Sequence, residues 1–254
     1  MKPFKYALAS LALAVAATFS HAATVDVTFD NPIFTGSDSD DVYVTYKTAS
    51  GITVTKHLLA GRFQGTASDL QGVAASVFVD SLSDLYMYCY DIHENISHGQ
   101  FVNDFNIDFT GVTALTLDFL GAVNQVLNLG KSKYDPFAWL HPLNRFQGAA
   151  IQLGIWESLY DTAGTWNLGD GDFKASGLEN GSSADMKTQQ WWDAFIGQTG
   201  NSDSLAQSYT MVLRKARVQD MITGDPASVP EPGSLALLAG GLGGLLLARR
   251  RKSA

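Results

Sequence analysis

Alternating apolar and polar positions predict strands in the first half of the chain. Between residues 24 and 29, valine and phenylalanine alternate with threonine and aspartate, which is the pattern of a strand with one buried face. Further short runs rich in β-branched and aromatic residues lie at 42–46, 52–55, 73–79 and 85–90. We therefore expect residues 24–110 to be rich in strands.

The spacing of apolar residues becomes helical after residue 110. The segment 119–127 fits a helix, whereas 113–117 fits a strand equally well. The clearest helix is predicted over 144–160, where Asn144 is the expected N-cap and Gln147 follows three residues later, as in a capping box.

The last third of the body predicts one more helix and a return to strands. A third helix is expected over about 184–196, and strands over 209–213 and 217–222. The order of strands, helices and strands predicts an α+β fold, an antiparallel sheet or barrel with an inserted or adjacent helical subdomain.

The first 22 residues have the pattern of a secretory signal peptide. Lys2 and Lys5 precede an apolar segment over 6–19, and small residues then favour cleavage between Ala22 and Ala23. Without any amphipathic pattern, the alternative of a buried N-terminal helix is weaker. We expect signal peptidase to process an exported chain.

The C-terminal segment has three parts in a fixed order. Val-Pro-Glu-Pro at 229–232 is followed by an apolar run at 235–248 and then by a basic cluster, 249–252. Prolines prevent helix formation in the first part, and the basic cluster favours a cytoplasmic end. The run is short and contains four glycines, so we expect a marginal membrane helix.

This segment resembles the PEP-CTERM sorting signal of Gram-negative bacteria. The resemblance rests on the tripeptide, the apolar run and the arginines: Pro230, Glu231, Pro232, Arg249, Arg250 and Arg251. It implies that an exosortase recognises the tripeptide, removes a transient membrane tether and passes the body to the cell surface or the exopolysaccharide matrix of a biofilm. An ordinary single-span anchor is the alternative. The expected organisation is a signal peptide (1–22), a body (23–225) and a sorting segment (226–254).

The amino-acid composition excludes several classes of function for the body. The chain of 254 residues has a formal net charge of -8, and basic clusters at both ends leave the body still more acidic. Such a body repels phosphate backbones, so we expect no nucleic-acid partner. A single cysteine excludes an intrachain disulfide framework and a cysteine-based zinc cluster, and we expect no cofactor or resident metal.

Two residues of the body are candidates for covalent chemistry. Cys89 lies in the aromatic strand segment 85–90, and Gln152 lies beside the apolar stripe of the helix predicted over 144–160. A buried amide must find hydrogen-bond partners or incur a cost of about 1–3 kcal/mol. The alternative for Cys89 is a small buried hydrophobic residue.

The surrounding motifs resemble those of the thioester domains of Gram-positive surface adhesins. An aromatic-Cys-aromatic strand and an Ala-Ile-Gln-x-small-Ile-Trp helix carry the resemblance, although Gly154 stands where alanine is expected. The resemblance implies that Cys89 attacks the Gln152 carboxamide to form an internal thioester, which then captures an amine-bearing surface or matrix polymer. The supporting positions are Tyr88, Tyr90, Ile155 and Trp156. Because such a protein reacts once, we do not expect an enzyme.

Four other interpretations remain open. The main one is a noncatalytic, acidic component of the matrix or envelope with a buried free cysteine. A secreted hydrolase would combine Cys89 with His93 and Asp91, although the usual signatures around a nucleophilic cysteine are absent. Acidic loops at 37–41 and 170–172 could bind calcium, but neither fits the twelve-residue calcium loop. Sugar binding would use stacking on tryptophan rings, although helically spaced aromatic residues more often form a core: Trp156, Trp166, Trp191 and Trp192.

Overall fold

The computed structural model describes residues 23–34, 39–48, 50–161, 165–176 and 183–225. The expected signal peptide, with Ala22 at its end, and the expected sorting segment lie outside the described residues. Within the described part of the chain, every helix is too short or too polar to cross a membrane.

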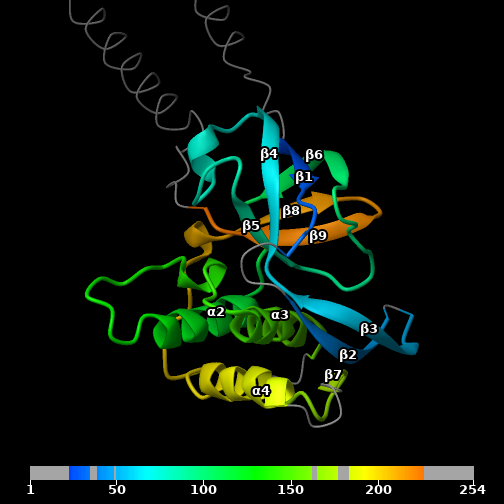
Figure 1. Cartoon of the computed structure of the whole chain (residues 1–254), viewed down its shortest axis with the longest axis vertical. Helices are drawn as coiled ribbons and strands as arrows, with labels where there is room; N and C mark the ends of the chain where they lie inside the picture. Colours follow the sequence, from blue (N-terminus) through cyan, green and yellow to red (C-terminus); the bar gives the residue numbers. More distant parts are fainter. Residues whose placement is uncertain (1–22, 35–38, 49, 162–164, 177–182, 226–254) are drawn as a thin grey trace, which may run out of the picture.

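The larger β structure is a closed antiparallel barrel of six strands (Figure 1). Its strands are β1 (Thr24–Phe29), β4 (Phe63–Gln71), β5 (Leu85–Cys89), β6 (Phe101–Asp108), β8 (Met211–Lys215) and β9 (Val218–Thr223). They are joined in the order β1-β4-β5-β9-β8-β6, so the first and last segments of the body meet in one barrel. The inward residues Val25, Val27 and Phe29 of β1 are buried, as the alternating pattern predicts.

A second, three-stranded antiparallel sheet lies beside the barrel. It consists of β2 (Ser39–Lys47), β3 (Thr53–Gly61) and β7 (Phe173–Ser176), in the order β3-β2-β7. The side chain of Thr188 donates a 2.6 Å hydrogen bond to the buried carboxylate of Asp40, which joins this sheet to the last helix.

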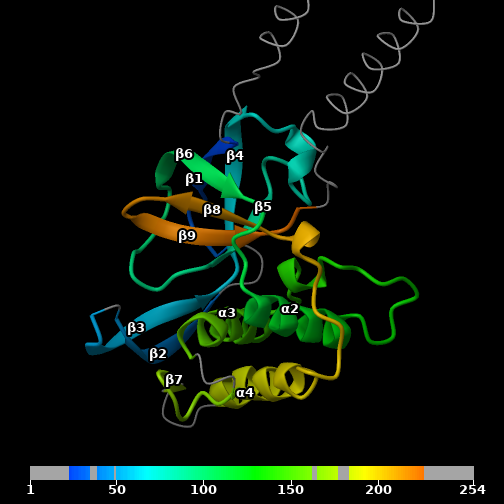
Figure 2. The same ribbon diagram turned by 180° about the vertical axis from the view of Figure 1, so that it is seen from behind.

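Three helices cover the end of the barrel and the second sheet (Figures 1 and 2). They are α2 (Ala114–Leu127), α3 (Arg145–Tyr160) and α4 (Ser183–Ile196). Short 3-10 turns are η1 (Ala75–Val77), η2 (Ala138–Leu140) and η4 (Gln207–Tyr209). Helix α3 contacts α2, α4, β5 and all three strands of the second sheet, and its residues 147–158 are all buried. It is the central element of the helical layer.

The predicted α+β class, with a barrel and adjacent helices, is confirmed. Asn144 caps α3 by accepting hydrogen bonds from the N–H groups of Phe146 and Gln147. The carbonyl oxygen of the Gln147 side chain bonds to the N–H of Leu143, one residue before the position that a capping box requires. Residues 114–117 are helical, which decides between the two interpretations of that segment.

The strand predicted over 73–79 is wrong. This segment contains η1 and pairs with no strand of the barrel. Its centre, Ala-Ala-Ser, has low β propensity, and the apolar neighbours Val77 and Phe78 are buried by the short turn instead.

Three strands, β4, β6 and β7, were not identified individually from the sequence. Strand β4 is polar and contains Gly65, which pairs with Phe29 of β1. A β-carbon at Gly65 would lie 2.7 Å from the carbonyl oxygen of Thr28, so the close approach of these strands requires glycine. Because the barrel imposes this constraint, glycine replaces a large apolar residue in β4, and the sequence there does not show the alternating pattern that predicts a strand.

Candidate functional site

The structure brings Cys89 and Gln152 together, although they are 63 positions apart in the chain. The backbone N–H of Cys89 donates a 2.9 Å hydrogen bond to the Gln152 side-chain oxygen Oε1. The Gln152 nitrogen Nε2 donates a 2.8 Å hydrogen bond to the backbone carbonyl of Cys89. Both residues are buried, so the two bonds satisfy polar groups that are removed from water.

Strand pairing explains why the Cys89 backbone is available for Gln152. On one side, β5 pairs with β9 as far as Cys89, which lies opposite Met221. On the other side, the ladder with β4 ends at the pair Phe63 and Met87, two residues before Cys89. The amide of Gln152 takes the place of a neighbouring strand at this point of the barrel.

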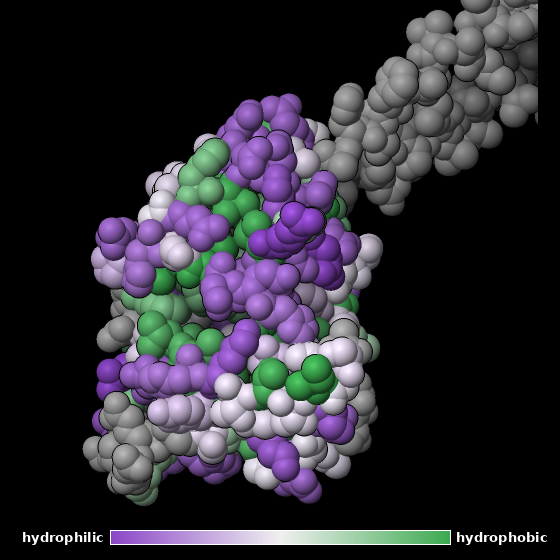
Figure 3. Space-filling view, turned by 90° about the vertical axis from the view of Figure 1, so that its right-hand side faces the viewer, coloured by the Kyte–Doolittle hydropathy of each residue, from purple (hydrophilic) through white to green (hydrophobic). Residues whose placement is uncertain are grey.

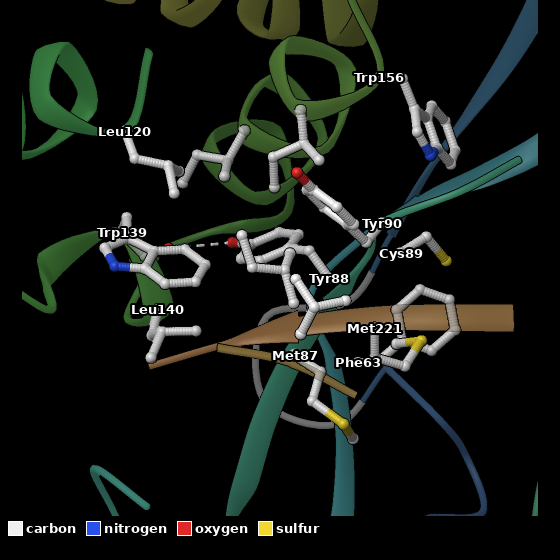
Figure 4. Packing of buried hydrophobic residues seen from close by; sticks show 14 of the residues in the cluster. Phe63, Met87, Tyr88, Cys89, Tyr90, Leu120, Trp139, Leu140, Trp156 and Met221 are labelled. Carbon is white, nitrogen blue, oxygen red and sulfur yellow. Dashed lines mark hydrogen bonds between the residues drawn. The ribbon is translucent and has the colours of Figure 1, made fainter. Parts of the chain in front are cut away.

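The side chains of Tyr88 and Cys89 lie on opposite sides of β5, as strand alternation requires. In Figure 4 the ring of Tyr88 points toward Trp139, whereas the Cys89 sulfur lies on the side of Trp156 and Phe63. Burial, and then the negative charge of Asp91, raise the pKa of the Cys89 thiol well above its usual range. The resting thiol is therefore protonated, so a reaction as thiolate requires transfer of its proton.

The hydrogen bonds orient the Gln152 carboxamide relative to the residue that carries the thiol. The N–H of Cys89 is directed at the oxygen on which negative charge would develop if sulfur attacked the amide carbon. The amide nitrogen, which would depart, is held by the carbonyl of the same residue. The arrangement supplies one backbone donor at that oxygen.

The four supporting residues fall near this pair and have structural partners of their own. The hydroxyl of Tyr88 donates to the Trp139 carbonyl at 3.3 Å. The hydroxyl of Tyr90 donates to the carbonyl of Gly111 at 3.2 Å and accepts from the N–H of Thr113 at 2.9 Å. These contacts fix the aromatic strand on both sides of Cys89.

The two helical supporting residues differ in their contacts. Ile155 is fully buried in the hydrophobic core. The indole nitrogen of Trp156 donates a 3.0 Å hydrogen bond to the backbone carbonyl of Asp91, two residues after Cys89. Trp156 thus joins α3 to the segment that follows Cys89 in the chain.

Asp91 is a structural centre of this region that the sequence interpretation considered only as a hydrolase acid. Its carboxylate accepts hydrogen bonds from the N–H of Asp220 at 2.6 Å, from Nε2 of Gln219 at 2.8 Å and from the N–H of His93 at 3.1 Å. The bond to His93 is the local turn that an aspartate commonly makes with the residue two positions on, and this signal was available in the sequence. The bonds to β9 were not, because they depend on the tertiary fold.

His93 is the third residue of the hydrolase interpretation, and its described ring contacts are with residues other than Cys89. The ring of His93 packs against Tyr46 and Tyr160, with ring centroids 5.6 and 5.5 Å away. The geometry therefore gives no support to a Cys89–His93 pair.

A cavity of about 260 Å³ reaches Cys89 where the barrel meets the second sheet. Aliphatic and aromatic side chains from β3, β4 and α3 form much of its wall, and polar side chains are contributed by His57, Glu94, His98 and Gln219. On the face shown in Figure 3, apolar residues lie between bands of polar ones. The cavity gives a small molecule or an extended side chain a route toward the buried cysteine.

Three of the tryptophans considered for sugar binding pack against other aromatic rings, and residues 37 and 38 of the first acidic loop lie outside the described residues. The rings of Trp166 and Trp192 pack with Phe119, and Trp191 packs with Phe195, as expected for core aromatics. Among the described residues, no group of three or more His, Cys, Asp or Glu side chains has the arrangement of a metal site.

Comparison with known proteins identifies the C-terminal segment. Residues 228–252 match the family described as the PEP-CTERM protein-sorting motif, a range that includes the Pro-Glu-Pro tripeptide and the three arginines. No curated protein and no solved structure matches the chain. The class defined by the motif is that of exported proteins that an exosortase processes at the membrane. This chain carries that motif after the folded body described above.

Proposed function

We propose that this exported, exosortase-sorted protein forms an internal thioester between Cys89 and Gln152 and uses it once to attach itself covalently to an amine-bearing surface or matrix polymer. The proposal makes the protein a single-use attachment module of the cell surface or matrix, not an enzyme. The hydrogen bond from the Cys89 N–H to the Gln152 carbonyl oxygen is the observation that carries it.

The first step is an intramolecular acyl transfer. The Cys89 sulfur attacks the Gln152 amide carbon Cδ and forms the S–C bond, while the C–N bond breaks. The thiol proton passes to the departing nitrogen, so that ammonia leaves and no oxidant or cofactor is consumed. An amide is a poor electrophile, and this step therefore depends on fixed geometry and on a donor at the carbonyl oxygen.

The second step consumes the thioester. The nitrogen of a neutral primary amine attacks the same carbon, the S–C bond breaks, and the proton lost by nitrogen returns to sulfur. The product is a stable amide between Gln152 and the captured amine, with Cys89 restored as a thiol. Each chain then reacts only once.

Burial supports both steps. Gln152 is fully buried, so bulk water is kept from its acyl carbon, which protects a thioester from hydrolysis. The cavity beside Cys89 supplies the approach for an amine. Glu94 lines the cavity and is positioned to attract the protonated form of an amine before that amine loses its proton.

The decisive experiment is the intact mass of the purified body. A thioester makes the protein one ammonia lighter than its sequence, and incubation with methylamine adds that amine at Gln152. Variants Cys89→Ser and Gln152→Glu must both have the full mass of their sequences and capture no methylamine. Full mass in the wild type, with Cys89 alkylated completely after unfolding, would disprove the thioester. The alkylation must follow unfolding because the native thiol is buried.

The alternative is a noncatalytic matrix or envelope component. It is favoured by the fact that the two Gln152 hydrogen bonds also satisfy a buried amide in an unreacted protein. This alternative predicts that Cys89→Ser leaves surface attachment unchanged, whereas the thioester proposal predicts its loss.

A further inference from the structure

The two edges of the second sheet differ in length and in protection. One edge is β7, which has only four residues, and the other is β3, which has nine. Strand β3 contains no proline and pairs with β2 through nine consecutive residues without a bulge. Lys56 lies opposite the buried Val44, and its ammonium group donates to the backbone carbonyl of Ile92 at 3.1 Å. Strand β3 therefore lacks the proline, the bulge and the short length by which edge strands usually avoid pairing with another chain.

The direction of the backbone groups of β3 follows from its register with β2. The N–H of Thr48 donates to the carbonyl of Ile52 at 2.9 Å, at the turn that joins the two strands. From that point, hydrogen-bonded and non-hydrogen-bonded pairs alternate along the antiparallel ladder. The N–H and C=O groups of Thr55, His57 and Leu59 therefore face away from β2, and no other backbone group among the described residues bonds to them.

The cavity that reaches Cys89 lies along this edge. Three consecutive residues of β3, His57, Leu58 and Leu59, line it. Successive side chains point to opposite faces of a strand, so a cavity lined by all three lies beside the strand and not on one face of the sheet. Residues of the segment 92–98 also line the cavity, and this segment passes between the barrel and β3 in both ribbon views (Figures 1 and 2). The outward backbone groups thus border a cavity that a ligand can enter.

We propose that the edge of β3 binds an extended polypeptide segment of a partner protein, which adds to the three-stranded sheet as a fourth strand. A peptide backbone presents alternating donors and acceptors that match those of Thr55, His57 and Leu59. The formal net charge of -8 disfavours an acidic exopolysaccharide, and Glu94 in the cavity favours a neutral or cationic segment. Because the segment 92–98 forms a second wall, a single chain fits better than the sheet edge of a second copy.

This binding site goes beyond the proposed function, because strand addition does not depend on the thioester. One consequence does rest on that function: a segment bound to β3 would bring an amine-bearing side chain into the cavity beside Cys89. Strand pairing would then select the partner, and the thioester would attach it.

A peptide array tests the site without covalent capture. The array carries random peptides of nine residues, the length of β3, and the labelled protein carries Cys89→Ala, so failure of the thioester leaves the test unaffected. We expect His57→Pro, which removes one outward N–H, to weaken binding of the selected peptides by about tenfold. His57→Ala is the matched control, because it removes the same side chain, keeps the N–H and should change the affinity by less than about threefold. Thermal unfolding of both variants verifies that the body remains folded.

N-methylation of the selected peptides is a second test that leaves the protein unchanged, and it decides alone if His57→Pro does not fold. In a peptide bound as a strand, alternate N–H groups face β3. Methylation of these groups should weaken binding by about tenfold, whereas methylation of the residues between them should have a much smaller effect.

Four outcomes would overturn the proposal. The first two are an array without any bound peptide and a methylation pattern without a period of two. The third is binding of a polysaccharide, in place of peptides, that His57→Pro weakens. The fourth is dimerisation of the protein that His57→Pro abolishes, because the occupant of the edge would then be a second copy of this chain.

Discussion

The ring of Phe119 lies where the β-carbon of any residue other than glycine at position 154 would be. Phe119 belongs to α2 and Gly154 to α3, so the glycine sets how closely the two helices approach. Glycine stands at position 154, where the resemblance noted from the sequence predicted alanine, because the Phe119 ring occupies the space that a methyl group would need. The departure accommodates an aromatic ring and leaves Gln152 in place.

Gly154→Ala should therefore destabilise the body. We expect a loss of about 1–3 kcal/mol in the free energy of unfolding, because overpacking outweighs the roughly 1 kcal/mol that alanine gains in helix propensity. Denaturant unfolding measures the change. The matched control is Gly148→Ala in the same helix, where a β-carbon would meet its nearest neighbour, the backbone nitrogen of Arg62, at an ordinary 3.6 Å. If both variants lose the same stability, Phe119 is not the cause.

The Gln152 side chain should stabilise the fold even where no thioester can form. In a Cys89→Ala background, Gln152→Met should cost roughly 2–5 kcal/mol, because it leaves the buried N–H and carbonyl of residue 89 without partners. Denaturant unfolding of the single and double variants gives the value. A cost below about 1 kcal/mol would show that water replaces the amide.

Glu157 should make stability fall as pH rises. Burial raises its pKa from 4.5 to about 7, while the N–H of Asn167 lowers the pKa and the charge of Asp161 raises it. The folded state then holds a proton that the unfolded state has released, so the free energy of unfolding should decrease by roughly 2–3 kcal/mol between pH 4.5 and 7. The difference between wild type and Glu157→Gln at each pH isolates this effect. Parallel pH profiles for the two proteins would contradict it.

The sorting motif should control processing of the chain without affecting the fold of the body. Replacement of Pro230, Glu231 and Pro232 by alanine should abolish removal of the C-terminal segment in cells that contain the exosortase. The mature mass and the distribution between membrane and medium measure the outcome. Ser253→Ala lies outside the matched range and should be processed normally. Normal processing of the triple variant would show that another sequence directs it.

The sequence predicted much of the fold because the signals were local. Asn144 and the apolar spacing that follows it defined α3 almost to the residue. Strand β4 was missed because two of its three buried positions, Gly65 and Ala67, are small. Gly65 is required by the close approach of Thr28, a contact that only the closed barrel creates.

The residues of the candidate site also fall into two groups, those with a local sequence signal and those without one. Cys89 and Gln152 were identified from their local motifs, and the structure brings them together. The contacts of Asp91 with Gln219 and Asp220 were not predicted, since they cross 128 and 129 positions of the chain.

The pairing of Cys89 with Met221 has a mechanical consequence. Strand β9 is the last described strand before the sorting motif, and β5 lies directly beside it. In the proposed product the load is held at Gln152, so tension toward the C-terminus would act between helix α3 and strand β9. Strand β5, which is bonded to Gln152 at Cys89 and paired with β9 at the same residue, lies between them.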